Sequence, residues 1–181
     1  MKKLLLIIAM GLIFLPKADA CVGRILNIGV TNSAEGQVFA EMLSTIISER
    51  TGTTVYTKFF KSPQELYEAV KVKKVDILIE NTSRALQVLN RPADVNAKRA
   101  YDTVKIIYEK EKGLAWLKPF GFVNSNGAES QSYTATVLRV DVFSDFPALP
   151  RVIDKLGGMI SDEAYVKMIK SVESGEKPKK V

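Results

Sequence analysis

The chain has 181 residues but no histidine, and its single cysteine is Cys21. Without histidine it lacks the side chain that most often acts as a general base or metal ligand near neutral pH. One cysteine cannot form a disulfide within the chain and provides no zinc-binding spacing, and no P-loop is present. The sequence therefore predicts a protein that is not an enzyme and that has no cofactor or metal.

A strong charge of one sign is also missing. Lysine and arginine number 26 against 20 acidic residues, a formal net charge of +6. Loss of residues 1–20, which carry three lysines and one aspartate, leaves +6 − 3 + 1 = +4. Part of this excess lies in the tail 177–180, and the rest is spread among acidic residues on helices, so we expect no nucleic-acid partner.

The first twenty residues have the pattern of a secretory signal peptide. Lys2 and Lys3 precede an apolar run over 4–15, and small residues occupy positions 18 and 20, before Cys21. Such a run is too short for an ordinary membrane-spanning helix. We expect cleavage after residue 20 and release into the periplasm; an uncleaved anchor and a lipoprotein acylated at Cys21 are the alternatives. Residues 21–181 are enough for one domain with a hydrophobic core.

The rest of the chain alternates strand and helix patterns. Apolar or β-branched runs predict strands over 25–31, 53–60 and 75–80, with helices between them. Later segments predict helices over 83–89, 95–112, 146–156 and 161–174, and strands over 113–122 and 133–143. Right-handed crossovers place strand 25–31 between the other two. We expect one three-layer α/β/α lobe with a mainly parallel sheet and an antiparallel hinge strand.

Helix starts are marked by capping residues. Asn32 and Glu35 have the spacing of a capping box, and Ser62 has the same spacing to Glu65. For the short helix 83–89, Thr82 or Ser83 is the expected cap.

The carboxyl ends of parallel strands and the starts of the following helices meet at one edge of the sheet, where ligands bind in α/β proteins. The residues predicted to bind a ligand there are Thr31, Asn32, Ser33, Phe60, Lys61, Glu80, Asn81 and Thr82. Most of these residues also have a purely structural explanation. Asn32 and Glu35 could do no more than cap a helix. Glu80 could be a solvated or paired acid. The Phe59-Phe60 pair could place one ring inward and one outward.

Several strings, in order, resemble the substrate-binding proteins of glycine betaine/choline-type (osmoprotectant) ABC transporters. They run from Ile28-Gly29 to Glu35, through Tyr67-Glu68-Ala69-Val70-Lys71 and Glu80-Asn81-Thr82-Ser83-Arg84-Ala85-Leu86, to Gly113-Leu114-Ala115-Trp116-Leu117-Lys118-Pro119 and the C-terminal helices. The resemblance covers residues 24–181. It implies a periplasmic-binding-protein-like fold of type II, a small ligand at the strand ends and an ABC transporter permease as partner.

The chain departs from that family in several ways, and two of them bear most directly on the ligand. The loop 123–132 stands where the family inserts a second lobe. It contains Asn126-Gly127, a dipeptide typical of a tight hairpin turn. Asn81 stands where the family has a tyrosine of the aromatic cage for the quaternary ammonium group. We therefore expect no binding of glycine betaine or choline at micromolar strength.

Two functions follow from these departures. The first is a one-lobed periplasmic solute-binding protein for a small polar ligand of unknown identity. The second is a non-enzymatic interaction module whose open cleft face docks on a partner, by self-association or with a separate second lobe. In the second case Trp116 and Phe120, at the former hinge, are candidate interface residues.

Overall fold

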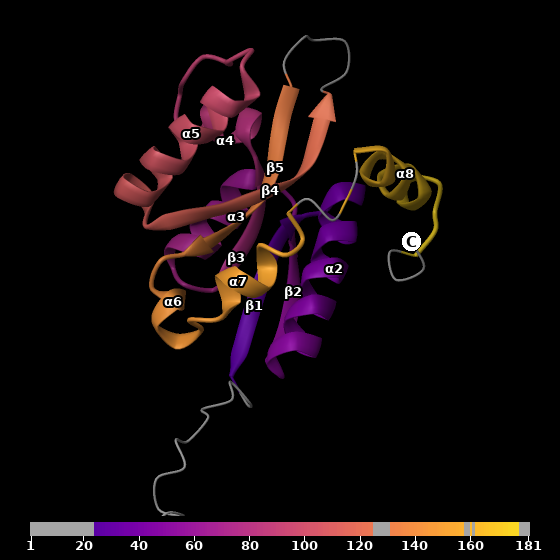
Figure 1. Cartoon of the computed structure of the whole chain (residues 1–181). Coiled ribbons are helices and arrows are strands. Elements are labelled where there is room, and N and C mark those ends of the chain that lie inside the picture. Colours follow the sequence, from indigo (N-terminus) through magenta and orange to yellow (C-terminus); the bar gives the residue numbers. More distant parts are fainter. Residues whose placement is uncertain (1–23, 125–130, 158–159, 161, 178–181) are drawn as a thin grey trace, which may run out of the picture.

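A mixed sheet covered by helices on both faces forms the body of the protein (Figure 1). The computed structural model describes residues 24–124, 131–157, 160 and 162–177, so the predicted signal peptide and the Asn126-Gly127 turn lie outside the described residues. The strands are β1 (Ile25–Thr31), β2 (Thr54–Phe60), β3 (Ile77–Asn81), β4 (Leu114–Asn124) and β5 (Gln131–Arg139). The helices are α2 (Ala34–Thr51), α3 (Pro63–Lys71), α4 (Thr82–Val88), α5 (Ala97–Ile107), the π-helix η2 (Tyr108–Lys112), α6 (Val142–Asp145), α7 (Leu149–Ile153) and α8 (Asp162–Glu173).

The strand order is β2-β1-β3-β5-β4. Ile28 of β1 pairs with Thr57 of β2 on one side and with Ile77 of β3 on the other, and both pairings are parallel. The predicted position of β1 between the other two strands is therefore confirmed. β5 runs antiparallel to both β3 and β4, which confirms the expected mixed sheet with an antiparallel strand.

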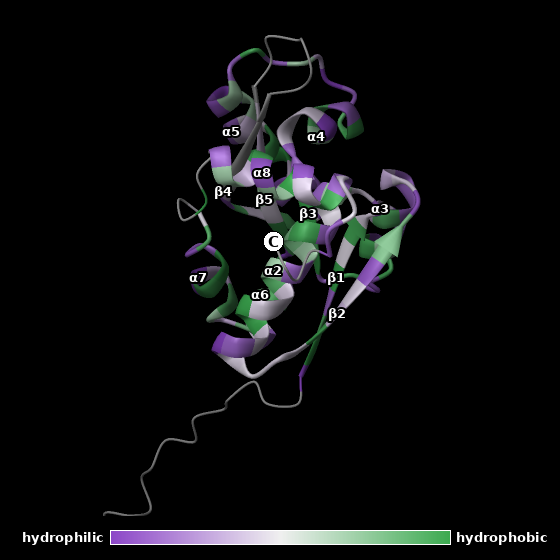
Figure 2. Ribbon diagram, turned by 90° about the vertical axis from the view of Figure 1, so that its right-hand side faces the viewer, coloured by the Kyte–Doolittle hydropathy of each residue, from purple (hydrophilic) through white to green (hydrophobic). Residues whose placement is uncertain are grey.

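Two hydrophobic clusters fill the two sides of the sheet. The first joins α2 to α7 and α8 across β1 and includes Phe39, Leu43 and Tyr165. The second lies under α3, α4 and α5 and includes Leu66 and Trp116. Figure 1 shows α3, α4 and α5 on one side of the sheet and α2 and α8 on the other, and Figure 2 looks onto the side of α2 and α8. Every buried core residue described lies between positions 26 and 165, so a chain that begins at residue 21 retains the whole core.

Two glycines allow close packing at the start of the fold. A Cβ atom on Gly29 of β1 would lie 2.6 Å from Leu66 Cδ1, and one on Gly36 of α2 would lie 2.3 Å from the Thr31 carbonyl oxygen. Both distances are far below van der Waals contact. These positions exclude any side chain unless the neighbours move.

The structure corrects several predicted boundaries. The strand predicted over 133–143 ends at Arg139, because the chain turns there into the short helix α6, while the Val140 N–H bonds back to the Gly113 carbonyl. Residues 123–124 and 131–132, predicted as loop, continue the hairpin of β4 and β5. Similarly, the helix predicted over 95–112 begins at Ala97 and changes to π geometry from Tyr108. Within the described ranges, no helix is long and apolar enough to cross a membrane.

Candidate functional site

The candidate site is the sheet edge at which β1, β2 and β3 end and α2, α3 and α4 begin. The backbone ties two of these strand ends together, since the Asn32 N–H donates to the Phe60 carbonyl at 3.0 Å. We call this surface the strand-end edge and define it by the eight residues predicted above. The structure brings all eight to this edge, but it gives them very different exposures.

At the start of α2, Ser33 rather than Asn32 caps the helix. Ser33 Oγ accepts a hydrogen bond from the Gly36 N–H at 3.1 Å, whereas Asn32 Oδ1 accepts only from the Gln37 side chain, at 3.4 Å. Glu35 Oε1 instead accepts from Thr134 Oγ1 at 3.0 Å and from the Tyr165 hydroxyl at 2.7 Å. The predicted capping box is therefore wrong, because Glu35 joins α2 to β5 and α8.

Glu80, at the end of β3, is fully buried, with 0% of its surface exposed. Its carboxylate accepts from the Tyr67 hydroxyl at 2.5 Å and from the Asn81 N–H at 2.9 Å, and it forms an ion pair with Arg84. Burial raises the pKa of the Glu80 carboxyl, while Arg84 and the other two donors oppose that rise. Of the two alternatives for Glu80, the paired acid is confirmed and the solvated acid is wrong.

The Glu80 network continues into the core through tyrosines. The Tyr67 and Tyr108 hydroxyls are 2.7 Å apart, and the Tyr108 ring meets Trp116 edge-on with centroids 5.5 Å apart. Burial raises the pKa of Tyr67 far above its ordinary value, and the nearby Glu80 charge adds to this. Tyr67 therefore stays protonated and can serve as a permanent donor to Glu80.

Asn81 and Thr82 also have structural partners. Asn81 Oδ1 accepts from the Arg84 N–H at 2.8 Å and so caps α4, which means that the predicted caps Thr82 and Ser83 are wrong. Thr82 is buried, and its Oγ1 lies 3.1 Å from Ser132 Oγ and accepts from the Tyr133 N–H at 3.2 Å. Thr82 thus links α4 to β5 by hydrogen bonds. Because it is buried, it is not accessible to a ligand.

At the end of β2, the two phenylalanines point to opposite sides, as the alternative for this pair predicted. Phe60 packs against the second core cluster, while Phe59 is 53% exposed. Lys61 is exposed, and its backbone N–H donates to Glu65 Oε2 at 3.2 Å.

The expected hinge surface is not open at Trp116. Its side chain is 2% exposed and lies among core aromatics, so the prediction of Trp116 as an interface residue is wrong. Phe120 lies on β4, but its side chain falls outside what the structure describes.

The accessible part of the strand-end edge is therefore smaller than predicted. Asn32 and Lys61 are exposed, while Thr31, Ser33 and Asn81 are partly exposed. A hollow of about 390 Å³ borders Asn32 on the side of α2. Within the described part of the chain, no group of three histidine, cysteine, aspartate or glutamate side chains is placed to hold a metal.

Sequence reasoning missed Arg84. Its guanidinium bonds Glu80 through Nε and the Ile79 carbonyl through Nη2 at 3.2 Å, and its side chain remains 23% exposed. The helical rule for residues four positions apart does not apply here, because Glu80 lies near the end of β3 whereas Arg84 lies in α4. No local signal marked Tyr67 or Tyr165 either, which reach their carboxylates from distant helices.

Comparisons with known proteins bear on the family and on the fold. Residues 25–148 match the model of a family described as the substrate binding domain of ABC-type glycine betaine transport systems. Among the curated proteins, no significant match is found.

Three solved structures illustrate the likeness of fold. A crystal structure of a glycine betaine/carnitine/choline ABC transporter protein has 12% identity and a TM-score of 0.71, with 84% of this chain and 94% of that chain covered. Apo YehZ from Escherichia coli has 11% identity and a TM-score of 0.70, with 86% and 95% covered. The periplasmic ectoine-binding protein of the TeaABC TRAP transporter of Halomonas elongata has 12% identity and a TM-score of 0.51, with 86% and 83% covered.

Proposed function

The chain belongs to the substrate-binding domains of ABC-type glycine betaine transport systems and is a solute-binding protein, and from this premise we propose that it binds a small polar ligand at the strand-end edge. The observation that carries the proposal is the convergence of accessible polar groups from successive strand ends. Asn32 and Ser33 follow β1, Lys61 follows β2, and all three are at least partly exposed. Ligands of open α/β sheets bind at such an edge.

The chemistry of the edge favours a ligand with several hydrogen-bonding groups. The Asn32 amide and the Ser33 hydroxyl can each donate and accept, and Lys61 supplies a cation. Glu80 is already neutralised by Arg84 inside the protein and is fully buried, so it adds no accessible negative charge.

Glycine betaine and choline are poor candidates for this ligand. A quaternary ammonium group is recognised by aromatic faces around the cation. At the expected cage position, Asn81 uses its side chain to cap α4, and Phe60 packs into the core. We propose that neither compound binds at micromolar strength.

The predicted signal peptide supports a periplasmic location, and the family supports work with an ABC transporter permease. In this proposal residues 21–181 form a single lobe that presents its ligand from an open surface. One side of the ligand stays in contact with water, which reduces affinity compared with a site enclosed on all sides.

A thermal-shift screen of osmolytes, amino acids and organic anions on residues 21–181 tests the proposal. A compound that binds only the folded state raises the melting temperature by mass action. Isothermal calorimetry then compares Asn32→Ala and Lys61→Ala with Lys71→Ala, which removes an exposed lysine from the far end of α3.

We expect at least one compound to bind, and the two variants at the strand-end edge to weaken it by about tenfold. Lys71→Ala should bind as the unaltered chain does. The proposal fails if no compound raises the melting temperature, or if the variants at the edge and the control bind equally well.

A further inference from the structure

β2 has one free side among the described strands. β2 is the first strand of the sheet order and pairs only with β1 among the described strands. The Thr54 N–H donates to the Arg24 carbonyl, and the Phe60 carbonyl accepts from the Asn32 N–H, so both residues direct their backbone groups towards β1. Because this direction alternates along a strand, Val55, Thr57 and Phe59 direct theirs away from the sheet.

The same strand exposes two aromatic side chains. Tyr56 is 54% exposed and Phe59 is 53% exposed, on opposite faces of the sheet. Proteins commonly protect a free edge with charged side chains, proline or a bulge. The one charged residue within β2 is Lys58, and its Nζ is held by the Lys74 carbonyl at 2.9 Å, beside α3.

We propose that β2 joins two copies of this chain as antiparallel neighbours about a twofold axis at Thr57. In this register Thr57 lies opposite Thr57 of the second copy, and Val55 lies opposite its Phe59. The outward N–H and C=O groups of these residues then bond across the axis, and two sheets become one. An exposed strand edge that pairs with another strand is an established mode of protein association.

The side chains favour this register over its neighbours. Tyr56 of each copy lies opposite Lys58 of the other, whose aliphatic stem can pack on the ring. On the opposite face, Val55 packs against Phe59. A register centred on Lys58 would instead place two like charges directly opposite each other, which is unfavourable.

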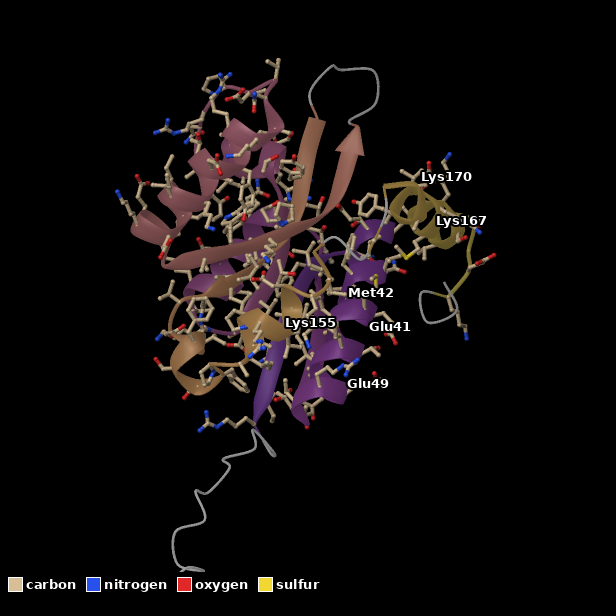
Figure 3. All side chains as sticks on the ribbon, viewed as in Figure 1. Glu41, Met42, Glu49, Lys155, Lys167 and Lys170 are labelled. Atoms are coloured by element: carbon tan, nitrogen blue, oxygen red, sulfur yellow. The ribbon has the colours of Figure 1, made fainter. Side chains whose placement is uncertain are left out.

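The helices leave room for the second copy. α8 contacts α2 and β4, and β4 is at the other end of the sheet order from β2. The hollow of about 390 Å³ includes Thr57 and Phe59 in its lining and lies between β2 and α2. Glu41 also lines this hollow, on the outer surface of α2 (Figure 3), so the two Glu41 carboxylates approach the axis and repel each other. We therefore expect added salt to tighten the pairing.

Pairing through β2 and the strand-end edge meet at the hollow beside Asn32. The contact is centred on Thr57, whereas the strand-end edge begins at Phe60. Because the two β2 strands run in opposite directions, the two strand-end edges lie at opposite ends of the dimer. The hollow that borders Asn32 is also lined by Thr57 and Phe59, so a ligand that fills it would lie beside the contact.

Sedimentation velocity on residues 21–181, over a series of protein concentrations, tests the proposal. We expect a reversible monomer–dimer equilibrium. Thr57→Pro removes an N–H that points away from β1, so it should leave the fold intact and weaken the dimer by at least about tenfold. Val72→Ser is the control, because Val72 is an equally exposed apolar residue outside β2, and it should leave the equilibrium unchanged.

A charge exchange tests the register independently of proline. Tyr56→Lys places two lysines opposite each other and should weaken the dimer, and Tyr56→Lys combined with Lys58→Glu should restore it. If Thr57→Pro fails to fold by circular dichroism, this pair of variants decides the question. A monomer at every concentration, or a dimer that Tyr56→Lys leaves unweakened, would overturn the proposal.

Discussion

Replacement of Arg84 by methionine should be one of the most destabilising single changes at the strand-end edge. The variant keeps the aliphatic stem but removes the charge that faces the buried Glu80 carboxylate. Removing one partner of a buried ion pair costs about 3–5 kcal/mol. Glu80 retains its bonds from Tyr67 and Asn81, so we expect the lower end, about 3 kcal/mol of unfolding free energy. For a domain of this size that corresponds to a fall of roughly 6–12 °C in melting temperature.

The loss should depend on pH in a defined direction. Without Arg84, the pKa of the Glu80 carboxyl rises further, because burial then has no opposing cation. A carboxyl whose folded pKa exceeds its unfolded value of about 4.3 binds its proton more tightly in the folded chain. The unfolding free energy lost in Arg84→Met should therefore be small near the unfolded pKa of the Glu80 carboxyl. The loss should grow as pH rises towards the folded pKa of Glu80 in the variant.

Urea unfolding at several pH values, followed by the fluorescence of Trp116, measures the unfolding free energy directly. The chain has one tryptophan, and it lies in the second hydrophobic cluster, beside Tyr108. Arg99→Met is the matched control, because it removes an arginine from the exposed pair with Asp94 and should change little. Adding Glu80→Gln to Arg84→Met should restore part of the stability. A loss below about 1 kcal/mol, or a loss that is the same at acid and neutral pH, would refute the reasoning.

Two further predictions concern the start of α2 and are measured by the same unfolding experiment. Ser33→Ala should cost about 1 kcal/mol because it removes the helix cap, whereas Asn32→Ala should cost much less; equal losses would contradict the assignment of the cap. Gly36→Ala should cost about 1–3 kcal/mol because its Cβ would meet the Thr31 carbonyl, despite the better helix propensity of alanine; an unchanged or raised stability would show that the backbone gives way there.

The fold was predictable because local patterns agree with the tertiary structure. The apolar run of β1 and the cap at Ser62 each specified one outcome, and the crossover rule then fixed the order of the first three strands. The end of β5 was missed because Val140 to Phe143 continues an apolar pattern that suits either a strand or a helix. The strand ends there because the Val140 N–H bonds to the Gly113 carbonyl, a contact between distant residues that the local sequence does not reveal.

The candidate site was less predictable than the fold. The sequence located the correct edge of the sheet but could not tell which polar residues had partners inside the protein. Glu80 and Thr82 are buried because Tyr67 and Ser132 reach them from other elements, and these contacts depend on packing that no local spacing encodes. Trp116 was a candidate interface residue, and its burial among core aromatics likewise depends on packing between distant elements.

The contact between Glu35 and Tyr165, which are separated by 130 positions, limits the order in which a growing chain can fold. The second cluster draws on residues 66–137 and is available as soon as β5 has been made. The first cluster also needs α7 and α8, which follow β5 in the chain, to complete the cover of α2. Until residue 165 has emerged, the apolar face of α2 has the sheet on one side but lacks part of its cover, so we expect a chain held on the ribosome short of that point to bind chaperones.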